Sequence, residues 1–195
     1  MRNRCITIGM ILVILAILGC GGPRTFLNAN TDWTFYKQLG VMPFENLTGD
    51  RFAGEKVQSA FITELFLAEK FQVVEPGEFN AEVAQQVKAA GMQPGQELSL
   101  EQIKVIGEKA GVQGVIEGSV REYSMIRVGQ ADYPIISLSL RMIDVPTGTV
   151  VWMTSFSKKG GPNFPVVSIG ETHTLSELTQ KICHQVISDF VGRAF

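Results

Sequence analysis

Cysteine, histidine and paired carboxylates are the residue types in this chain that could support catalysis. Cys183 and His184 are neighbours in a segment with helical periodicity, so their side chains point about 100° apart and do not form a nucleophile–base pair. We expect a core thiol at Cys183 and a surface imidazole at His184. Glu117 and Glu122 are five residues apart in an expected strand, which puts them on opposite faces unless a bulge intervenes. Neither pair predicts an active site.

The segment 49–57, GDRFAGEKV, has glycines and a lysine but not the order of a phosphate-binding loop. Such a loop needs a lysine and a hydroxyl directly after its second glycine, whereas here Glu55 follows the glycine and Val57 replaces the hydroxyl. Just before it, Asn46 and Thr48 fit a glycosylation sequon, but we expect them to stabilise a turn. No Cys/His cluster has zinc spacing. We therefore expect a non-enzyme with no cofactor and no metal.

A definite chemical role is expected for Cys20. Two arginines open the chain, and the apolar run over residues 6–18 would measure about 20 Å as a helix, against about 30 Å of bilayer hydrocarbon. This is the pattern of an export signal, too short to span comfortably. The run ends in Ile17-Leu18-Gly19-Cys20, which looks like a bacterial lipobox. We expect cleavage after Gly19 and attachment of acyl chains to Cys20.

A processed chain that begins at Cys20 would have 176 residues, enough for one domain. Loss of two arginines lowers the formal net charge from −2 to −4, which argues against a nucleic-acid partner. Cys183 would be the remaining free thiol, so no intrachain disulfide is expected. Gly21, after the cysteine, favours the outer membrane over the inner one, with the body facing the periplasm.

Residues 20–36 are expected to be a lipid-anchored tether, because they show no sustained periodicity. Trp33, Phe35 and Tyr36 make this segment unusually apolar for a linker. Either the arm packs on its own domain, or these three aromatic residues form an interface with a neighbouring subunit or with lipid headgroups.

The rest of the chain, residues 37–195, is expected to fold as a single α/β domain. Strands are expected over 38–44, 71–75, 112–128, 133–145 and 150–157, and helices over 52–70, about 77–91, 100–110 and 171–191. Ser99 and Gln102 form the pattern of a capping box. The order predicts a mixed β-sheet with early parallel βαβ units and a late antiparallel three-strand meander, flanked by helices.

Three segments resemble the curli-secretion (CsgG-like) lipoprotein superfamily, which shares a fold with the N-terminal domain of the TolB translocation protein. They are VMPFENLTGD (41–50), GVQGVIEGSV (111–120) and LSLRMIDVPTGTVVW (138–152). The resemblance implies a non-enzymatic periplasmic domain at the outer membrane that forms homo-oligomeric rings or collars in envelope secretion or assembly. The regions that become transmembrane hairpins in the curli pore are short or rich in Gly, Pro and Lys here, so we expect no barrel from this chain.

The alternative within the same superfamily is a lipoprotein activator of a penicillin-binding protein. Thr147, Gly148 and Trp152 match a motif that those activators share. Such activators usually carry a long proline-rich tether, whereas the segment expected here reaches at most about 55 Å. We therefore expect a collar, with the cell-wall synthase activator as the alternative.

Overall fold

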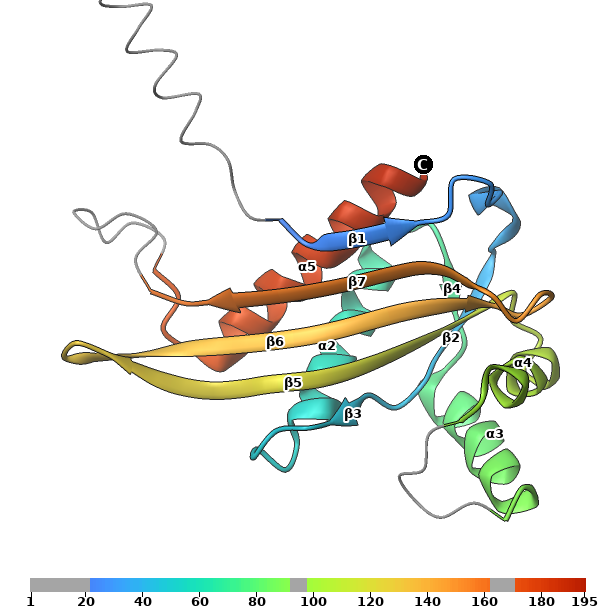
Figure 1. Ribbon diagram of the computed structural model, residues 1–195, viewed down its shortest axis with the longest axis horizontal. Coiled ribbons are helices and arrows are strands. Elements are labelled where there is room, and N and C mark those ends of the chain that lie inside the picture. Colours follow the sequence, from blue (N-terminus) through green and yellow to red (C-terminus); the bar gives the residue numbers. More distant parts are fainter. Residues whose placement is uncertain (1–21, 92–97, 162–170) are drawn as a thin grey trace, which may run out of the picture.

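The computed structural model describes residues 22–91, 98–161 and 171–195 of the chain (Figure 1). The strands are β1 (Arg24–Leu27), β2 (Gln38–Val41), β3 (Glu45–Asn46), β4 (Gln72–Val73), β5 (Gly114–Val128), β6 (Ala131–Asp144) and β7 (Val150–Lys159). The helices are the 3-10 turn η1 (Trp33–Phe35), α2 (Ala53–Leu67), α3 (Pro76–Ala89), α4 (Leu100–Lys109) and α5 (Leu175–Ala194).

All seven strands belong to one sheet, in the order β1-β7-β6-β5-β2-β4, with β3 beside β5. β2 pairs in parallel with both β4 and β5, while the pairs β5–β6, β6–β7 and β7–β1 are antiparallel. Parallel pairing follows from the helical crossovers, and antiparallel pairing from the short hairpin turns of the meander. The predicted mixed α/β fold is confirmed.

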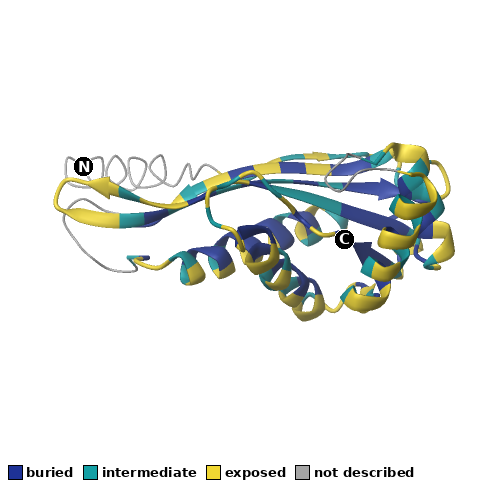
Figure 2. Cartoon of the chain, turned by 90° about the horizontal axis from the view of Figure 1, so that it is seen from below, coloured by how far each residue is buried: buried dark blue, intermediate teal, exposed yellow. Residues whose placement is uncertain are grey.

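Helices α2 and α5 cover one face of the sheet. The side chains that alternate inward along β6 meet the apolar stripe of α5, and both are buried (Figure 2). Phe190 lies at the centre of this core, stacked on Trp152 at 4.5 Å and on Phe71 at 5.7 Å between ring centroids. This aromatic cluster ties the last helix to the middle of the sheet.

The opposite face is covered by helices at one end alone. There, α3 and α4 enclose a second hydrophobic core. The sheet contributes to it the side chains of β5 and β6 that alternate with the first-face residues, such as Val115 and Ile143. The α4 helix begins at the predicted capping box, because Ser99 accepts from the amide of Gln102 and the Gln102 side chain accepts in return. Away from that end, no described helix packs on this side of β5, β6, β7 and β1 (Figure 2). We call this surface the open face.

The N-terminal arm differs from the expected tether. Residues 24–27 form an edge strand, β1, paired antiparallel with β7 from Arg24–Ser155 to Leu27–Trp152. Thr25 donates a 2.6 Å hydrogen bond to Asp189 of α5, which fastens the strand to the helix layer. Residues 24–36 are therefore part of the folded body, which corresponds to the alternative that the arm packs on its own domain.

A buried carboxylate organises the turn between β6 and β7. Asp144 accepts hydrogen bonds from the Tyr36 hydroxyl at 2.8 Å and from the Thr147 hydroxyl at 2.6 Å and amide at 3.1 Å. Gly148 follows with φ of +68°, a conformation that favours glycine. Three residues of the segment that resembles the lipoprotein superfamily, Asp144, Thr147 and Gly148, thus have a structural role in this turn.

The strand expected over 38–44 is shorter in the structure. Strand β2 ends at Val41, and Glu45 and Asn46 form a separate short strand, β3, parallel to β5. Pro43 lies just beyond the end of β2, an interior strand of the sheet. A proline at that point breaks no ladder hydrogen bond, because the strand has already ended.

Candidate functional site

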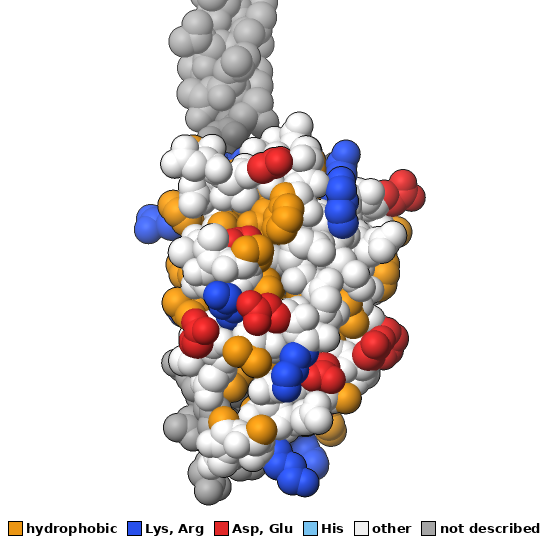
Figure 3. Space-filling view, turned by 90° about the vertical axis from the view of Figure 1, so that its right-hand side faces the viewer, with side chains coloured by type: hydrophobic (Ala, Val, Ile, Leu, Met, Phe, Trp, Pro, Cys, Tyr) orange, Lys and Arg blue, Asp and Glu red, His pale blue; other side chains and the backbone are white. Residues whose placement is uncertain are grey.

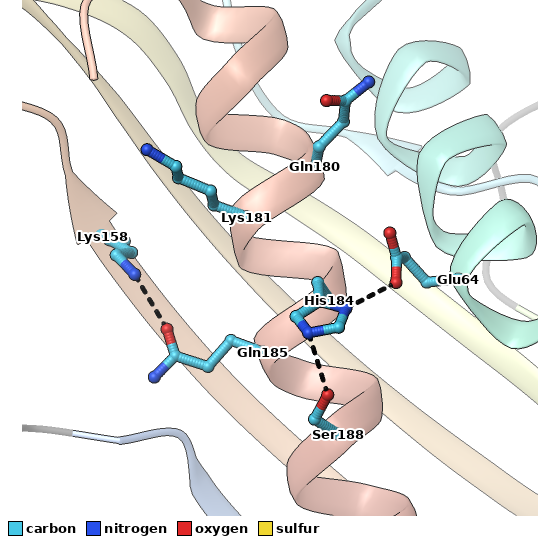
Figure 4. Close-up of a pocket in the computed structure, with 7 residues that line it drawn as sticks. All are labelled: Glu64, Lys158, Gln180, Lys181, His184, Gln185 and Ser188. Carbon is cyan, nitrogen blue, oxygen red and sulfur yellow. Dashed lines mark hydrogen bonds and ion pairs between the residues drawn. The ribbon is translucent and has the colours of Figure 1, made fainter. Parts of the chain in front are cut away.

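Two adjoining hollows lie beside helix α5. One, of about 480 Å³, is lined mainly by polar side chains of α5 together with Glu64 of α2 and Lys158 of β7 (Figure 4). The other, of about 750 Å³, lies between α2 and the first half of α5 and reaches Tyr123 of β5. Both share Glu64 and Gln180, so they form one shallow groove along the helix layer.

A serine, a histidine and a glutamate line up in this groove. His184 lies 2.9 Å from Glu64 through Nδ1 and 3.5 Å from the Ser188 hydroxyl through Nε2 (Figure 4). This is the order of groups in a hydrolase triad, where a histidine activates a serine and a carboxylate orients the histidine. The sequence analysis missed the contact because Glu64 is 120 residues away from His184.

The surroundings of this array do not fit acyl transfer. The His184 side chain is 70% exposed, so water competes for both of its nitrogens. Ser188 lies inside a regular helix, where backbone amides bond to the preceding turn and cannot serve as oxyanion donors. The array acts instead as a surface link between α2 and α5.

Cys183 faces the core on the other side of the same helix. It is fully buried, and its Sγ lies 3.8 Å from the carbonyl oxygen of Val57. Burial, with a smaller contribution from Glu64, raises the pKa of the thiol to about 12. The predictions of a core thiol at Cys183 and a surface imidazole at His184 are confirmed.

The P-loop-like segment is occupied by its own side chains. Lys56 forms a 3.0 Å ion pair with Asp50 and lies 5.3 Å above the ring of Tyr123. This hydrogen bond, followed by one from the Phe52 amide, lowers the pKa of Asp50 below its usual value. As expected, Asn46 stabilises the preceding turn, since its Oδ1 accepts from the amide and hydroxyl of Thr48.

The two glutamates of β5 lie on the same face of the sheet. A β-bulge between Val120 and Glu122 shifts the register, so that Glu117 pairs with Arg141 and Glu122 with Ser137. Their partners, Arg141 and Ser137, are four residues apart on β6 and therefore lie on one face of the sheet. The bulge thus places both glutamates on the same face, whereas a regular strand would place them on opposite faces. Glu117 forms a 2.6 Å ion pair with Arg141. Four strand positions separate the two glutamates by roughly 13 Å along the sheet, which is too far for a catalytic acid–base pair.

The three aromatic residues expected at an interface are placed differently from one another. Trp33 and Tyr36 are buried, and Trp33 packs edge-on against Phe190 at 5.3 Å. Phe35 is 47% exposed and leans on the Tyr36 ring. The arm thus packs on its own domain, and of these three Phe35 alone is available to a partner.

Gly19 and Cys20, the expected cleavage and lipid-attachment residues, lie outside the described residues. In the described ranges, no helix combines the length and apolar character needed to cross a bilayer. Within the same ranges, no three His, Cys, Asp or Glu side chains gather as metal ligands. At the end of the molecule near α3 and α4, acidic and basic side chains are interspersed (Figure 3). That surface lacks the continuous basic patch of a nucleic-acid interface.

Three solved bacterial proteins have a fold similar to that of this chain, at low sequence identity to it. PelC from Paraburkholderia phytofirmans, a dodecamer, has a TM-score of 0.58 and 18% identity over 86% of this chain and 97% of its own. Lipoprotein GNA1162 from Neisseria meningitidis has a TM-score of 0.54 and 19% identity, over 80% of this chain and 99% of its own. The hypothetical protein CT253 from Chlamydia trachomatis has a TM-score of 0.55 and 11% identity, over 82% of this chain and 98% of its own. At this identity, the likeness concerns the fold alone.

No curated protein sequence matched the chain. A family model described as "Peptidoglycan-synthase activator LpoB" matches residues 25–155. The match begins in β1 and ends in β7, so it includes all or part of every strand and more than half of the chain. The protein therefore belongs to the LpoB family of peptidoglycan-synthase activators.

Proposed function

We propose that this protein is an outer-membrane lipoprotein, attached through acyl chains on Cys20, whose periplasmic body is a non-catalytic, oligomeric collar in envelope secretion or assembly. The observation that carries the proposal is the position of β1. The strand begins at Arg24, four residues after Cys20, and four residues span at most about 14 Å. A body held this close to the membrane suits a collar around an export path.

Two further observations support a non-catalytic, oligomeric role. The Glu64–His184–Ser188 array is open to water and has no oxyanion donors. PelC, which is a dodecamer, has a similar fold over nearly its whole length. The similar body supports assembly here only as a hypothesis, because the fold alone does not determine the subunit contacts.

Sedimentation of the processed protein in mild detergent tests this proposal. Mass spectrometry of the intact N-terminus should first find acyl chains on Cys20 and no residues before it. Sedimentation should then give a closed oligomer of defined mass. An unmodified N-terminus would overturn the anchor, and a monomer at every concentration would overturn the collar.

The second candidate is a direct activator of a peptidoglycan synthase, and the family match favours it. The two candidates differ in reach, because such activators usually carry a long proline-rich tether, whereas β1 starts four residues after Cys20. Photo-crosslinkers placed at Phe35 and Leu67, which are exposed, would identify neighbours in cells. Crosslinks to a synthase would favour the activator, and crosslinks between copies would favour the collar.

A further inference from the structure

The two outermost strands of the sheet carry an unusual set of side chains on the open face. Because side chains alternate along a strand, β1 presents two residues there and β7 presents four. We call these six the β1–β7 strip: Arg24, Phe26, Met153, Ser155, Ser157 and Lys159. Two are apolar, two are cationic and two are small and hydroxylated, and none is acidic.

The two apolar members are direct neighbours. Phe26 and Met153 are cross-strand partners in the β1–β7 register, and they are 53% and 44% exposed. Single exposed apolar residues are common, but a contiguous pair beside cations suggests a contact surface. Arg24 precedes Phe26 by two residues on the same strand face, so its charge flanks the pair.

Charge is distributed unequally across the open face. Its acidic residues lie on the far strands: Glu45 on β3, and Glu117 and Glu122 on β5. Glu117 is moreover neutralised by Arg141. The face therefore has a cationic, partly apolar border at β1 and β7, whereas its acidic side chains lie on β3 and β5, close to Arg141 of β6 and the exposed Arg121 of β5.

The basic border is also the border nearest to the expected lipid anchor. Residue 20 precedes Arg24 by four residues, so an acylated Cys20 keeps the start of β1 within about 14 Å of the membrane surface. A membrane surface rich in phosphates attracts basic side chains and repels acidic ones. The short connection and the charge distribution thus orient the same border toward lipid.

We infer that the β1–β7 strip rests on the lipid headgroups of the membrane that holds the anchor, an inference that rests on the proposed acylation of Cys20. Phe26 and Met153 enter the boundary between headgroups and acyl chains, where apolar side chains on a flat surface are favourable. Arg24 and Lys159 face lipid phosphates. The acyl chains and the strip together fix the orientation of the body, which acyl chains alone would leave free to rotate.

Tryptophan fluorescence of the reconstituted lipoprotein tests this contact. Phe26→Trp, in the processed protein in vesicles of phosphatidylethanolamine and phosphatidylglycerol, should lose fluorescence when the lipids are replaced by brominated ones. Leu67→Trp is a matched control, because Leu67 is also apolar and exposed (69%) but lies on the helix layer. The native Trp33 and Trp152 are buried and supply a constant background.

Quenching of Phe26→Trp but not of Leu67→Trp supports the inference, and Met153→Trp should repeat it. Equal quenching of both sites, or none, overturns it. A blue-shifted, unquenched Phe26→Trp would show that protein rather than lipid covers the strip, which also overturns it. Mass spectrometry of the same samples separates the failures, because a missing acyl group refutes the proposed function, whereas an acylated but unquenched protein refutes only the membrane contact.

The cations provide an independent check. Arg24→Glu with Lys159→Glu should reduce the quenching of Phe26→Trp in the same vesicles, while Glu101→Lys, an exposed change on α4, should leave it unchanged. Equal effects of the double variant and the Glu101→Lys control would contradict a role of the strip in orienting the body.

Discussion

At the scale of single residues, the most constrained polar group is the carboxylate of Asp144. It is 7% exposed and is stabilised by donors from two distant parts of the chain, Tyr36 in the arm and Thr147 in the following turn. A buried carboxylate that loses a donor retains its desolvation cost. The Tyr36–Asp144 hydrogen bond therefore links the arm to the meander.

Tyr36→Phe should lower the free energy of unfolding by about 1–3 kcal/mol, because it removes a hydrogen bond to a buried charged group while preserving the ring. Denaturant unfolding of the folded body measures the change. Tyr133→Phe, in the half-exposed part of the hairpin, is the control and should change stability by less than about 0.5 kcal/mol. Equal effects of the two substitutions would argue against a special role of Asp144.

The same pair predicts a pH dependence at alkaline pH. Burial, and then the hydrogen bond to Asp144, raise the pKa of Tyr36 above its ordinary value of 10.0. A raised pKa in the folded state stabilises the protein below the unfolded-state pKa, and this stabilisation is lost as the pH rises above it. The stability difference between wild type and Tyr36→Phe should therefore be constant below about pH 9 and shrink as the pH rises above about 10, the ordinary pKa of tyrosine. A constant difference would contradict the assignment.

Cys183 should be almost unreactive in the folded protein. With its pKa raised to about 12, roughly one thiol in ten thousand is ionised at pH 8, and the buried sulfur is also inaccessible. Peptide mapping after treatment with iodoacetamide should find Cys183 unmodified until denaturant is added. Ser188→Cys, on the exposed side of the same helix, should be labelled rapidly and provides the control.

At the scale of elements, the N-terminal arm is the part that the sequence predicted least well. The long elements were predictable because their periodicity extends over ten or more residues, as along β6 and α5. Strand β1 has four residues, and its partner β7 is more than 120 residues away, so no local pattern reveals it. Trp33 and Tyr36 lie around a single 3-10 turn, which is too short to show a period.

Of the candidate site, the sequence predicted the orientation of neighbouring residues but not the contacts between distant elements. The neighbouring Cys183 and His184 were placed correctly because helical geometry alone separates them. The Glu64–His184 contact was not predictable, since it depends on how α2 packs against α5. The shared face of Glu117 and Glu122 depends on a bulge, and bulges carry no reliable sequence signal when glycine is absent.

Two substitutions within η1 test whether the arm is part of the fold. Trp33→Ala should lower the free energy of unfolding by about 3–5 kcal/mol, because it leaves a cavity beside Phe190 and Tyr36. Phe35→Ala, two residues away and 47% exposed, should cost no more than about 0.5 kcal/mol. Thermal or denaturant unfolding distinguishes them. A small effect of Trp33→Ala would mean that the arm does not contribute to the stability of the folded body and acts as a tether.

At the scale of the whole molecule, the body and its expected anchor are joined by a very short connection. Because Arg24 is paired in β1, trypsin should release the body only slowly from lipid vesicles that carry the reconstituted lipoprotein on their outer surface. A variant with an added Gly-Ser-Arg-Gly-Ser segment between Gly22 and Pro23 should be released rapidly at the new arginine. Immunoblotting of the supernatant measures both rates, and equal rates would mean that β1 is not held in the sheet.

The bulge at Arg121 has a consequence for how related molecules diversify. An extra residue in one strand bends the ribbon and increases its twist, so it determines the direction of the β5–β6 hairpin that projects beyond the helices (Figure 1). Deleting Arg121 would join Val120 to Glu122 in a regular ladder and leave every other side chain on its present face. A single codon lost or gained at this point would thus swing the tip toward a new neighbour without disturbing the core, a route by which one scaffold can be adapted to different assemblies.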